Sequence, residues 1–323
     1  MKTRELLAAL VLLMVAAACT STLTAGDGLL PTGMDQARVP QAELGGFVYL
    51  SASPGVAVST SRFVSSQGVA ELPADVPTQV DIVGATLVVG SSPEEIGGTL
   101  TFATPQDAET AWQVFEARKM GEENWGLLES PRMHAVRGEG PWATSVRSAL
   151  ESASLVPLST HDPDAWALVT NLPEQPPSAP IAAGVVSLED RLIEDFGAEA
   201  GFPLSDIADA LGLAGVEAIA FGVYSDLPSD AIESIDRDFL AQSGSAALFV
   251  SHSSYHGAIL SLVMRAGSGL SGLEEVELGD KTVRYRKIGD LHLVAKTEGS
   301  FIYAAVAAAR DDAEKLILSA ISD

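Results

Sequence analysis

The chain has 323 residues, of which 47% are hydrophobic and 19% are charged. This balance excludes a globally disordered chain, because the apolar side chains suffice for one large domain or two of ordinary size. The 43 acidic residues outnumber the 19 basic ones, which gives a formal net charge of −24. Such a surface repels phosphate backbones, so we expect no nucleic-acid partner.

The amino terminus combines positive charge with a short apolar run. Lys2 and Arg4 precede the apolar residues 6–18, and Cys19 follows a row of small side chains. A membrane-spanning helix needs about 20 apolar residues, so this run is too short to remain in a bilayer as a spanning segment. The order of charged, apolar and small residues is typical of a signal peptide that is removed.

Residues 15–19, Val-Ala-Ala-Ala-Cys, resemble the lipobox of bacterial lipoprotein precursors, with Ala16 where the commonest pattern has Leu. The resemblance implies cleavage before Cys19 and lipidation of that cysteine with diacylglyceryl and further acyl chains such as palmitate. Two or more chains hold a protein firmly to a membrane. The resemblance also implies a place in the cell envelope outside the cytoplasm. In a Gram-negative source, Thr20 at the sorting position implies the outer membrane.

Composition divides the remaining chain into segments. Residues 20–45 are rich in Thr, Gly, Pro and Ala without periodicity, which suits a flexible tether. A proline-rich stretch near the middle favours a domain boundary. We therefore expect a signal peptide (1–18), a lipidated cysteine and tether (19–45), a first α+β domain (46–172), a linker (173–180) and a second α+β domain (181–323).

Several helices carry start signals. Thr104 and Asp107 flank Pro105 and Gln106 in the pattern of a capping box, which predicts a helix with Ala108, Ala111, Trp112 and Phe115 on its buried face. Further helices are expected from Ser187, from about Pro228 and from about Arg310.

Strand patterns separated by few residues dominate the second half. Short connections require antiparallel neighbours, so the sequence predicts an α+β fold of mainly antiparallel sheets with packed helices. The expected strands are 47–50, 82–89, 99–102, 218–224, 246–251, 258–264, 282–288, 291–296 and 301–306.

The two halves share short similarities in two competing alignments. One pairs residues 133–142 with residues 291–301, and the other pairs residues 107–109 with residues 312–314. Each alignment depends on only a few residues, so a duplication giving two related halves is a hypothesis and both alignments stay open.

Two patterns in the second half suggest ligands but fit other structures better. Residues 267–272 have the glycine spacing of a dinucleotide-binding loop, yet too few residues follow for the required helix. His252 and His256 are spaced to share a metal, but no glutamate follows the first and no third ligand can be named. A loop and a strand end with exposed histidines are the better interpretations.

Three other groups of residues were weighed as sites. Residues 161–164, His-Asp-Pro-Asp, favour a turn or helix start over catalysis. The acidic runs 236–238 and 274–277 lack the pattern of an EF-hand loop and favour solvated faces. The chain has four tryptophans, which are Trp112, Trp125, Trp142 and Trp166. Only Trp125 is expected on a loop, where an aromatic platform could form.

No residue pattern specifies a chemistry, so Cys19 is the only site residue we assign, and we expect no catalytic residue, metal or cofactor. The single cysteine is taken up by the lipid, which leaves no disulfide or thiol nucleophile in the folded part. The expected function is a lipid-anchored, non-enzymatic binding or interaction protein. The alternative is the solute-binding lipoprotein of a transporter, although those proteins usually have mainly parallel sheets. An extracytoplasmic hydrolase is a further class.

Lipidation is tested by replacing the proposed acceptor. Cys19→Ser removes the thiol that would carry the lipid, so we expect metabolic labelling with palmitate to be lost and the uncleaved precursor to accumulate. A matched Thr20→Ser change leaves the thiol in place and should keep full labelling. Equal labelling of the Cys19→Ser protein would contradict lipidation at this residue.

Overall fold

The computed structural model describes residues 38–41, 46–52, 57–59, 79–90, 95–118, 124–173, 180–187, 215–226, 237–255 and 273–321. These residues form two compact units, the first ending at Pro163 and the second beginning at Asp164. Both units are antiparallel sheets with helices, which confirms the predicted α+β class. None of the described helices is long and apolar enough to cross a membrane.

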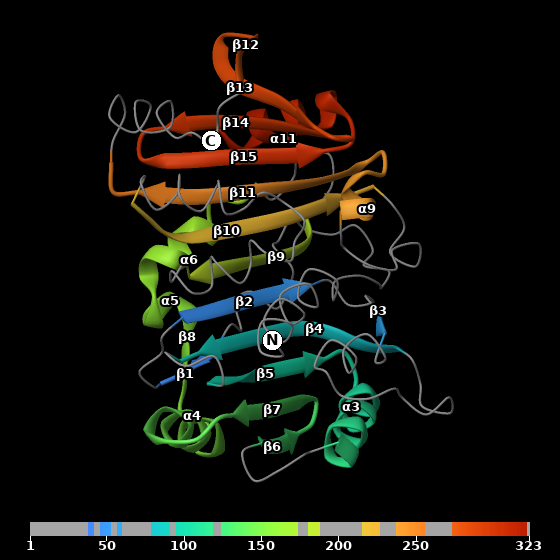
Figure 1. Ribbon diagram of the computed structural model, residues 1–323, viewed down its shortest axis with the longest axis vertical. Helices are drawn as coiled ribbons and strands as arrows, with labels where there is room; N and C mark the ends of the chain where they lie inside the picture. Colours follow the sequence, from blue (N-terminus) through green and yellow to red (C-terminus); the bar gives the residue numbers. More distant parts are fainter. Residues whose placement is uncertain are drawn as a thin grey trace. The chain divides into compact units, whose positions relative to one another are not determined.

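The first unit is built on an antiparallel sheet with the spatial strand order β2-β4-β5-β7-β6 (Figure 1). A short strand, β3, pairs with β4, and β1 pairs with β8 in a separate ladder. The strands are β1 (Arg38–Pro40), β2 (Gly46–Ala52), β3 (Ala57–Ser59), β4 (Gln79–Val89), β5 (Ile96–Phe102), β6 (Asn124–Glu129), β7 (Arg132–Arg137) and β8 (Leu155–Pro157).

Two helices of this unit, α3 (Pro105–Arg118) and α4 (Pro141–Glu151), lie on opposite faces of the sheet. Gly126 of β6 and Gly97 of β5 are opposite the successive residues 135 and 136 of β7, so they face opposite sides. A Cβ atom on Gly126 would strike the ring of Phe115 on α3. A Cβ atom on Gly97 would lie 3.2 Å from Cγ1 of Val146 on α4. The first unit therefore has a helix, sheet and helix in three layers.

The cap that the sequence predicts at the start of α3 is present, although Asp107 completes it by accepting from the Thr104 hydroxyl rather than from the Thr104 N–H. The backbone N–H of Asp107 donates to Oγ1 of Thr104 at 3.2 Å, and that hydroxyl donates to Oδ2 of Asp107 at 2.7 Å. Ala108 and Ala111 are buried as predicted, and Trp112 stacks on Phe115 with ring centroids 5.4 Å apart. The helix therefore begins where the sequence predicts, with its apolar face on the sheet.

The second unit is a larger antiparallel sheet with the strand order β9-β10-β11-β15-β14-β13-β12. Its last strands follow one another along the chain as hairpins, coloured orange to red in Figure 1. The strands are β9 (Pro180–Ser187), β10 (Val216–Ser225), β11 (Ser245–Ser253), β12 (Glu274–Leu278), β13 (Lys281–Ile288), β14 (Leu291–Glu298) and β15 (Phe301–Ala307).

Glycines at regular spacing form the hairpin turns of this unit. Gly279, Gly289 and Gly299 each begin a two-residue turn, with φ angles of 66°, 64° and 59°. Two-residue hairpin turns need positive φ at their first central residue, which glycine adopts without steric cost. These turns fix the register, so that Lys287 pairs with His292 across the second of them.

Helix α11 (Arg310–Ala320) packs on strands β11, β14 and β15. Its buried residues include Ala313, Leu316 and Ile317, as the predicted helical spacing requires. At its end, Nζ of Lys281 on β13 donates to the Ile321 carbonyl at 2.6 Å. The remaining described helices are α5 (Leu158–His161), α6 (Pro163–Val169) and α9 (Arg237–Leu240).

The two candidate alignments of the halves superpose different elements of the structure. In the alignment of residues 107–109 with 312–314, strand β5 followed by α3 coincides with strand β15 followed by α11. Both aligned alanines, Ala108 and Ala313, are fully buried. The other alignment places strand β7 on strand β14 but puts Trp142 of helix α4 on Phe301 of strand β15. In the first alignment, strand β4 falls across the turn between β13 and β14. Each alignment matches some elements and not others, so both stay open and a duplication remains a hypothesis.

Several local expectations were wrong. Trp125, expected on a loop, lies in strand β6, because its neighbours pair with β7. Strand β9 begins at Pro180, the last residue of the expected linker. Among the described residues the first unit ends at Pro163, and the domain boundaries at 172 and 181 stay a prediction. The carbonyl of Pro173, at the start of the same stretch, accepts a hydrogen bond from the buried Tyr224 hydroxyl at 3.2 Å. The acidic run 274–277 is exposed as expected but belongs to strand β12.

Other predicted elements lie outside the described residues. These are the signal peptide, the strand 258–264, most of the helix expected from Ser187 and most of the helix expected near Pro228. The helix near Pro228 is described only as α9, in which Phe239 is buried.

The capping box gives a stability test. Thr104→Ala removes the acceptor for the Asp107 N–H, so we expect the free energy of unfolding to fall by about 1 kcal/mol. Thr104→Ser keeps a hydroxyl and should retain most of the stability. Urea unfolding followed by tryptophan fluorescence suits this test, because Trp112 lies on the same helix. Equal loss in both variants would argue against a role for the cap.

Candidate functional site

Some residues weighed as sites from the sequence lie outside the described residues. These are Cys19, the glycine-rich residues 267–272 and His256. His252 is described: it is exposed near the end of β11, and its ring contacts that of Phe301 edge-on at 5.2 Å between centroids. The expectation of an exposed histidine at a strand end is confirmed for His252.

The remaining sequence candidates have structural roles. Residues 161–164 join the end of α5 to the start of α6, as expected of a turn and helix start. Val146 is buried on α4 beside the half-buried Trp142, whereas Trp166 is half-buried on α6. Among the described residues, no group of three His, Cys, Asp or Glu side chains could hold a metal ion.

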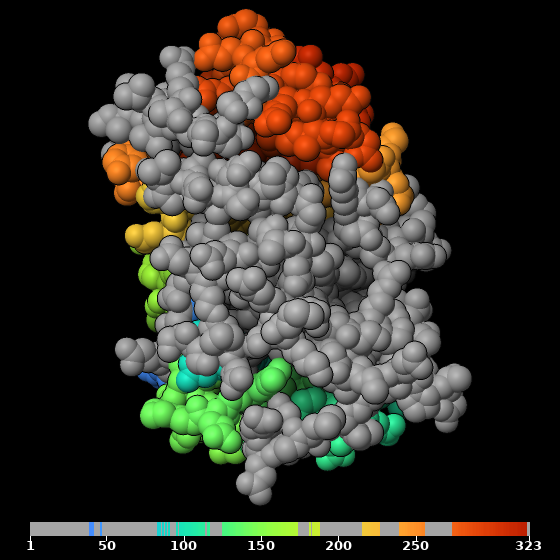
Figure 2. Space-filling model, in the orientation of Figure 1, coloured from blue at the N-terminus to red at the C-terminus, as the bar shows by residue number. Residues whose placement is uncertain are grey.

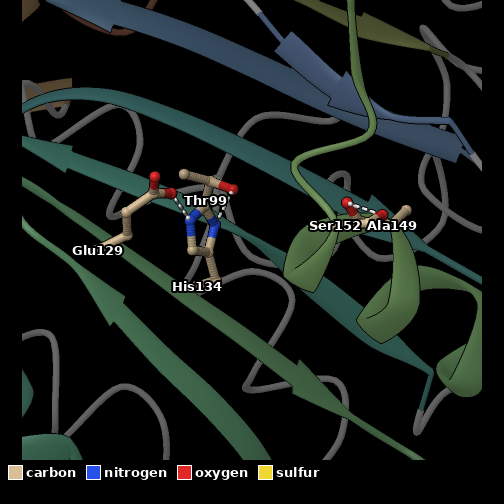
Figure 3. A network of polar contacts seen from close by, with 5 residues as sticks. All are labelled: Thr99, Glu129, His134, Ala149 and Ser152. Atoms are coloured by element: carbon tan, nitrogen blue, oxygen red, sulfur yellow. Dashed lines mark hydrogen bonds and ion pairs between the residues drawn. The ribbon is translucent and has the colours of Figure 1, made fainter.

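A buried histidine of the first unit contacts side chains on the two neighbouring strands, as Figure 3 shows. His134 on β7 has no exposed surface and pairs with Thr99 on β5. Nδ1 of His134 lies 2.8 Å from Oγ1 of Thr99, and Nε2 lies 3.3 Å from Oε2 of Glu129 at the end of β6. Figure 3 also shows the Ser152 hydroxyl, which donates to the Ala149 carbonyl at the carboxyl end of α4.

Burial sets the charge of this histidine. Desolvation lowers the pKa of His134 below 6.5, opposed by the hydrogen bond to Glu129 and by the charge of that carboxylate, while nearby Arg132 lowers it further. His134 is therefore neutral at neutral pH.

The order of hydroxyl, imidazole and carboxylate resembles a hydrolytic triad, but the geometry does not serve catalysis. Only 9% of Thr99 and none of His134 is exposed, so a substrate carbonyl could not reach the hydroxyl. The chain of contacts instead links β5, β7 and β6 through side chains. We therefore interpret it as a structural link.

A second polar cluster lies on the second unit and is accessible. The Tyr285 hydroxyl on β13 lies 2.7 Å from Nδ1 of His292 on β14, and the two rings stack with centroids 5.7 Å apart. The Arg310 guanidinium lies over the Tyr285 ring as a cation–π contact, with Cζ 4.4 Å from the ring centroid. Nε of Arg310 donates to Oε1 of Glu314 at 2.6 Å. We call Tyr285, Lys287, His292 and Arg310 the anion cluster.

Positive charges surround His292. Burial of the ring lowers the pKa of His292, and the charges of Lys287 and Arg310 lower it further. Lys287 is directly opposite His292 in the antiparallel pair, so both side chains leave the same face of the sheet. Two basic side chains therefore lie near His292 in a chain whose net charge is −24.

The sequence does not by itself reveal the anion cluster, although it predicts the two strands that carry three of its four residues. The strands 282–288 and 291–296 were predicted as neighbours, and a two-residue turn between them fixes the pair Lys287 and His292. Arg310 could not be placed in this way, because its position depends on how α11 packs on the sheet.

The buried histidine predicts a dependence of stability on pH. Because the folded state lowers the pKa of His134, the unfolded chain binds more protons just below pH 6.5. The free energy of unfolding should therefore fall as pH drops below 6.5, and this loss should level off below the folded-state pKa.

Urea unfolding of the wild-type protein and of His134→Asn at a series of pH values measures this loss. The substitution removes the titrating ring, so the pH dependence of the difference between the two proteins isolates His134. Glu129→Gln removes the carboxylate that opposes the shift and should extend the loss to lower pH. A difference that does not change with pH would contradict the assignment.

Comparisons with known proteins give no family. No protein-family model matches this chain, and no curated protein matches it. A solved structure titled "Structure of crystal form III of TP0453" aligns with 88% of this chain and 100% of its own, at 8% sequence identity and a TM-score of 0.34. A TM-score this low carries no argument about fold or function.

Proposed function

We propose that this chain is a lipid-anchored, extracytoplasmic binding protein rather than an enzyme, held to the membrane through lipid on Cys19. The anion cluster of the second unit is the observation that supports binding. Tyr285, His292 and Arg310 are held in place by contacts with one another, and all four side chains of the cluster remain partly or fully exposed to solvent. Such an arrangement suits recognition of a ligand, because little ordering is required when the ligand binds.

The polar groups of the two units support binding over hydrolysis. The buried Thr99 and His134 are closed to substrates. In the anion cluster, the hydroxyl that contacts Nδ1 of His292 belongs to a tyrosine. A hydrolase of the serine type needs an accessible nucleophile beside its base and donors for the oxyanion. Neither described cluster combines these groups.

Native mass spectrometry of the mature protein, residues 20–323, released gently from its own envelope, tests this function. We expect a reproducible small-molecule adduct on the wild-type protein. Tyr285→Phe removes the hydroxyl that contacts His292, so the adduct should weaken or disappear. Thr282→Val lies on the same strand outside the cluster and should keep it.

Two results would count against the proposal. A bare mass for the wild-type protein would argue against a bound small molecule, and steady turnover of a common substrate class would indicate an enzyme. An adduct retained equally by Tyr285→Phe would place the ligand elsewhere on the chain.

A further inference from the structure

The anion cluster brings donors from three elements to one face of the second unit. Tyr285 and Lys287 are two residues apart on β13, so they share a face of the sheet. His292 on β14 is opposite Lys287, and Arg310 on α11 lies over Tyr285. An imidazole, an ammonium and a guanidinium therefore lie around Tyr285 on the same face of the sheet.

Contacts within the cluster fix the direction of its donors. When Nδ1 of neutral His292 accepts from the Tyr285 hydroxyl, Nε2 carries the proton. Nε2 has no hydrogen-bond partner within the described part of the chain. Nε of Arg310 is engaged by Glu314, which leaves the two terminal nitrogens of its fork. The Lys287 side chain forms no ion pair with any described residue.

Three acidic residues also lie near the cluster, and they act mainly on Arg310 and Tyr285 rather than on Lys287. Glu314 pairs with Arg310, Asp311 lies close enough to raise the Arg310 pKa, and Glu274 is opposite Tyr285 across β12 and β13. Lys287 and Arg310 are the two charges that lower the His292 pKa. Lys287 has no ion-pair partner among the described residues, so an anion beside His292 would meet a positive charge that no nearby carboxylate engages.

The combination of donors indicates the kind of anion. A guanidinium fork matches two oxygens of a phosphate, an ammonium acts as a compact point charge, and an imidazole N–H donates one directed hydrogen bond. A carboxylate has only two oxygens for these three groups, whereas a phosphate monoester or inorganic phosphate has at least three. We propose, on the basis of the binding function above, that Lys287, His292 and Arg310 bind a phosphate group.

Phosphate binding is tested by an NMR titration of the histidine rings. The chain has five histidines, so the ring signals of the full-length protein can be assigned by single substitutions. Inorganic phosphate is added at constant ionic strength, with chloride as the reference anion. We expect a saturable shift of the His292 signal, no matching shift of the buried His134, and a rise in the His292 pKa because the anion stabilises the protonated ring.

Two matched substitutions locate the site. Lys287→Gln removes one charge-assisted hydrogen bond and should raise the dissociation constant for phosphate about tenfold. Arg284→Gln removes the same charge from the same strand, but alternation places residue 284 on the other face. It should leave the dissociation constant within about twofold. Equal weakening by both substitutions, or equal shifts with chloride, would overturn the proposal.

A second titration identifies the source of the phosphate. Vesicles of phosphatidylglycerol, compared with vesicles of phosphatidylcholine, should shift the His292 signal if the phosphate is that of an anionic lipid headgroup. A response to inorganic phosphate but not to phosphatidylglycerol would indicate a soluble phosphate compound. If phosphate and both vesicles leave His292 unchanged while the native adduct still depends on Tyr285, the phosphate inference is wrong and the binding function stands.

Discussion

The antiparallel register of the second unit determines which of its side chains can act together. Two-residue turns at Gly279, Gly289 and Gly299 leave no freedom to slide one strand along the next, because a shift by one residue would turn every side chain to the other face. Lys287 and His292 are thereby held opposite each other beside the second turn. Helix α11 then adds Arg310 from above, so the cluster depends on both local turn geometry and long-range packing.

His134 and His292 lie in the segments that one of the alignments pairs, 133–142 and 291–301, but their environments are opposite. His134 lies inside the first unit, where burial keeps it neutral and its two ring nitrogens contact strands on either side. His292 lies near the surface, where neighbouring positive charges also lower its pKa. The same residue type therefore serves as a link between strands in one unit and as part of an open polar cluster in the other.

Local signals explain which parts of the fold could be predicted from the sequence. The capping box at Thr104 and the helical spacing after Arg310 act through neighbours within a few residues, so both helices were located correctly. Trp125 was misplaced because the pairing of β6 with β7 is a tertiary contact with only weak alternation in sequence. The contact between His134 and Thr99 joins residues 35 positions apart, and Arg310 reaches Tyr285 from another element. Neither cluster could be assembled without strand register and helix packing.

The acidic strand β12 has a consequence for crowding. It is the terminal strand in the described sheet order, and Glu274, Glu275 and Glu277 are exposed along it. A terminal strand presents backbone groups that could pair with the same strand of another molecule. The carboxylates of the two β12 strands, one from each molecule, would then lie close together and repel each other. We propose that this protein is concentrated on a membrane surface, where neighbouring molecules meet often. The repulsion would there prevent their sheets from pairing edge to edge into a larger sheet.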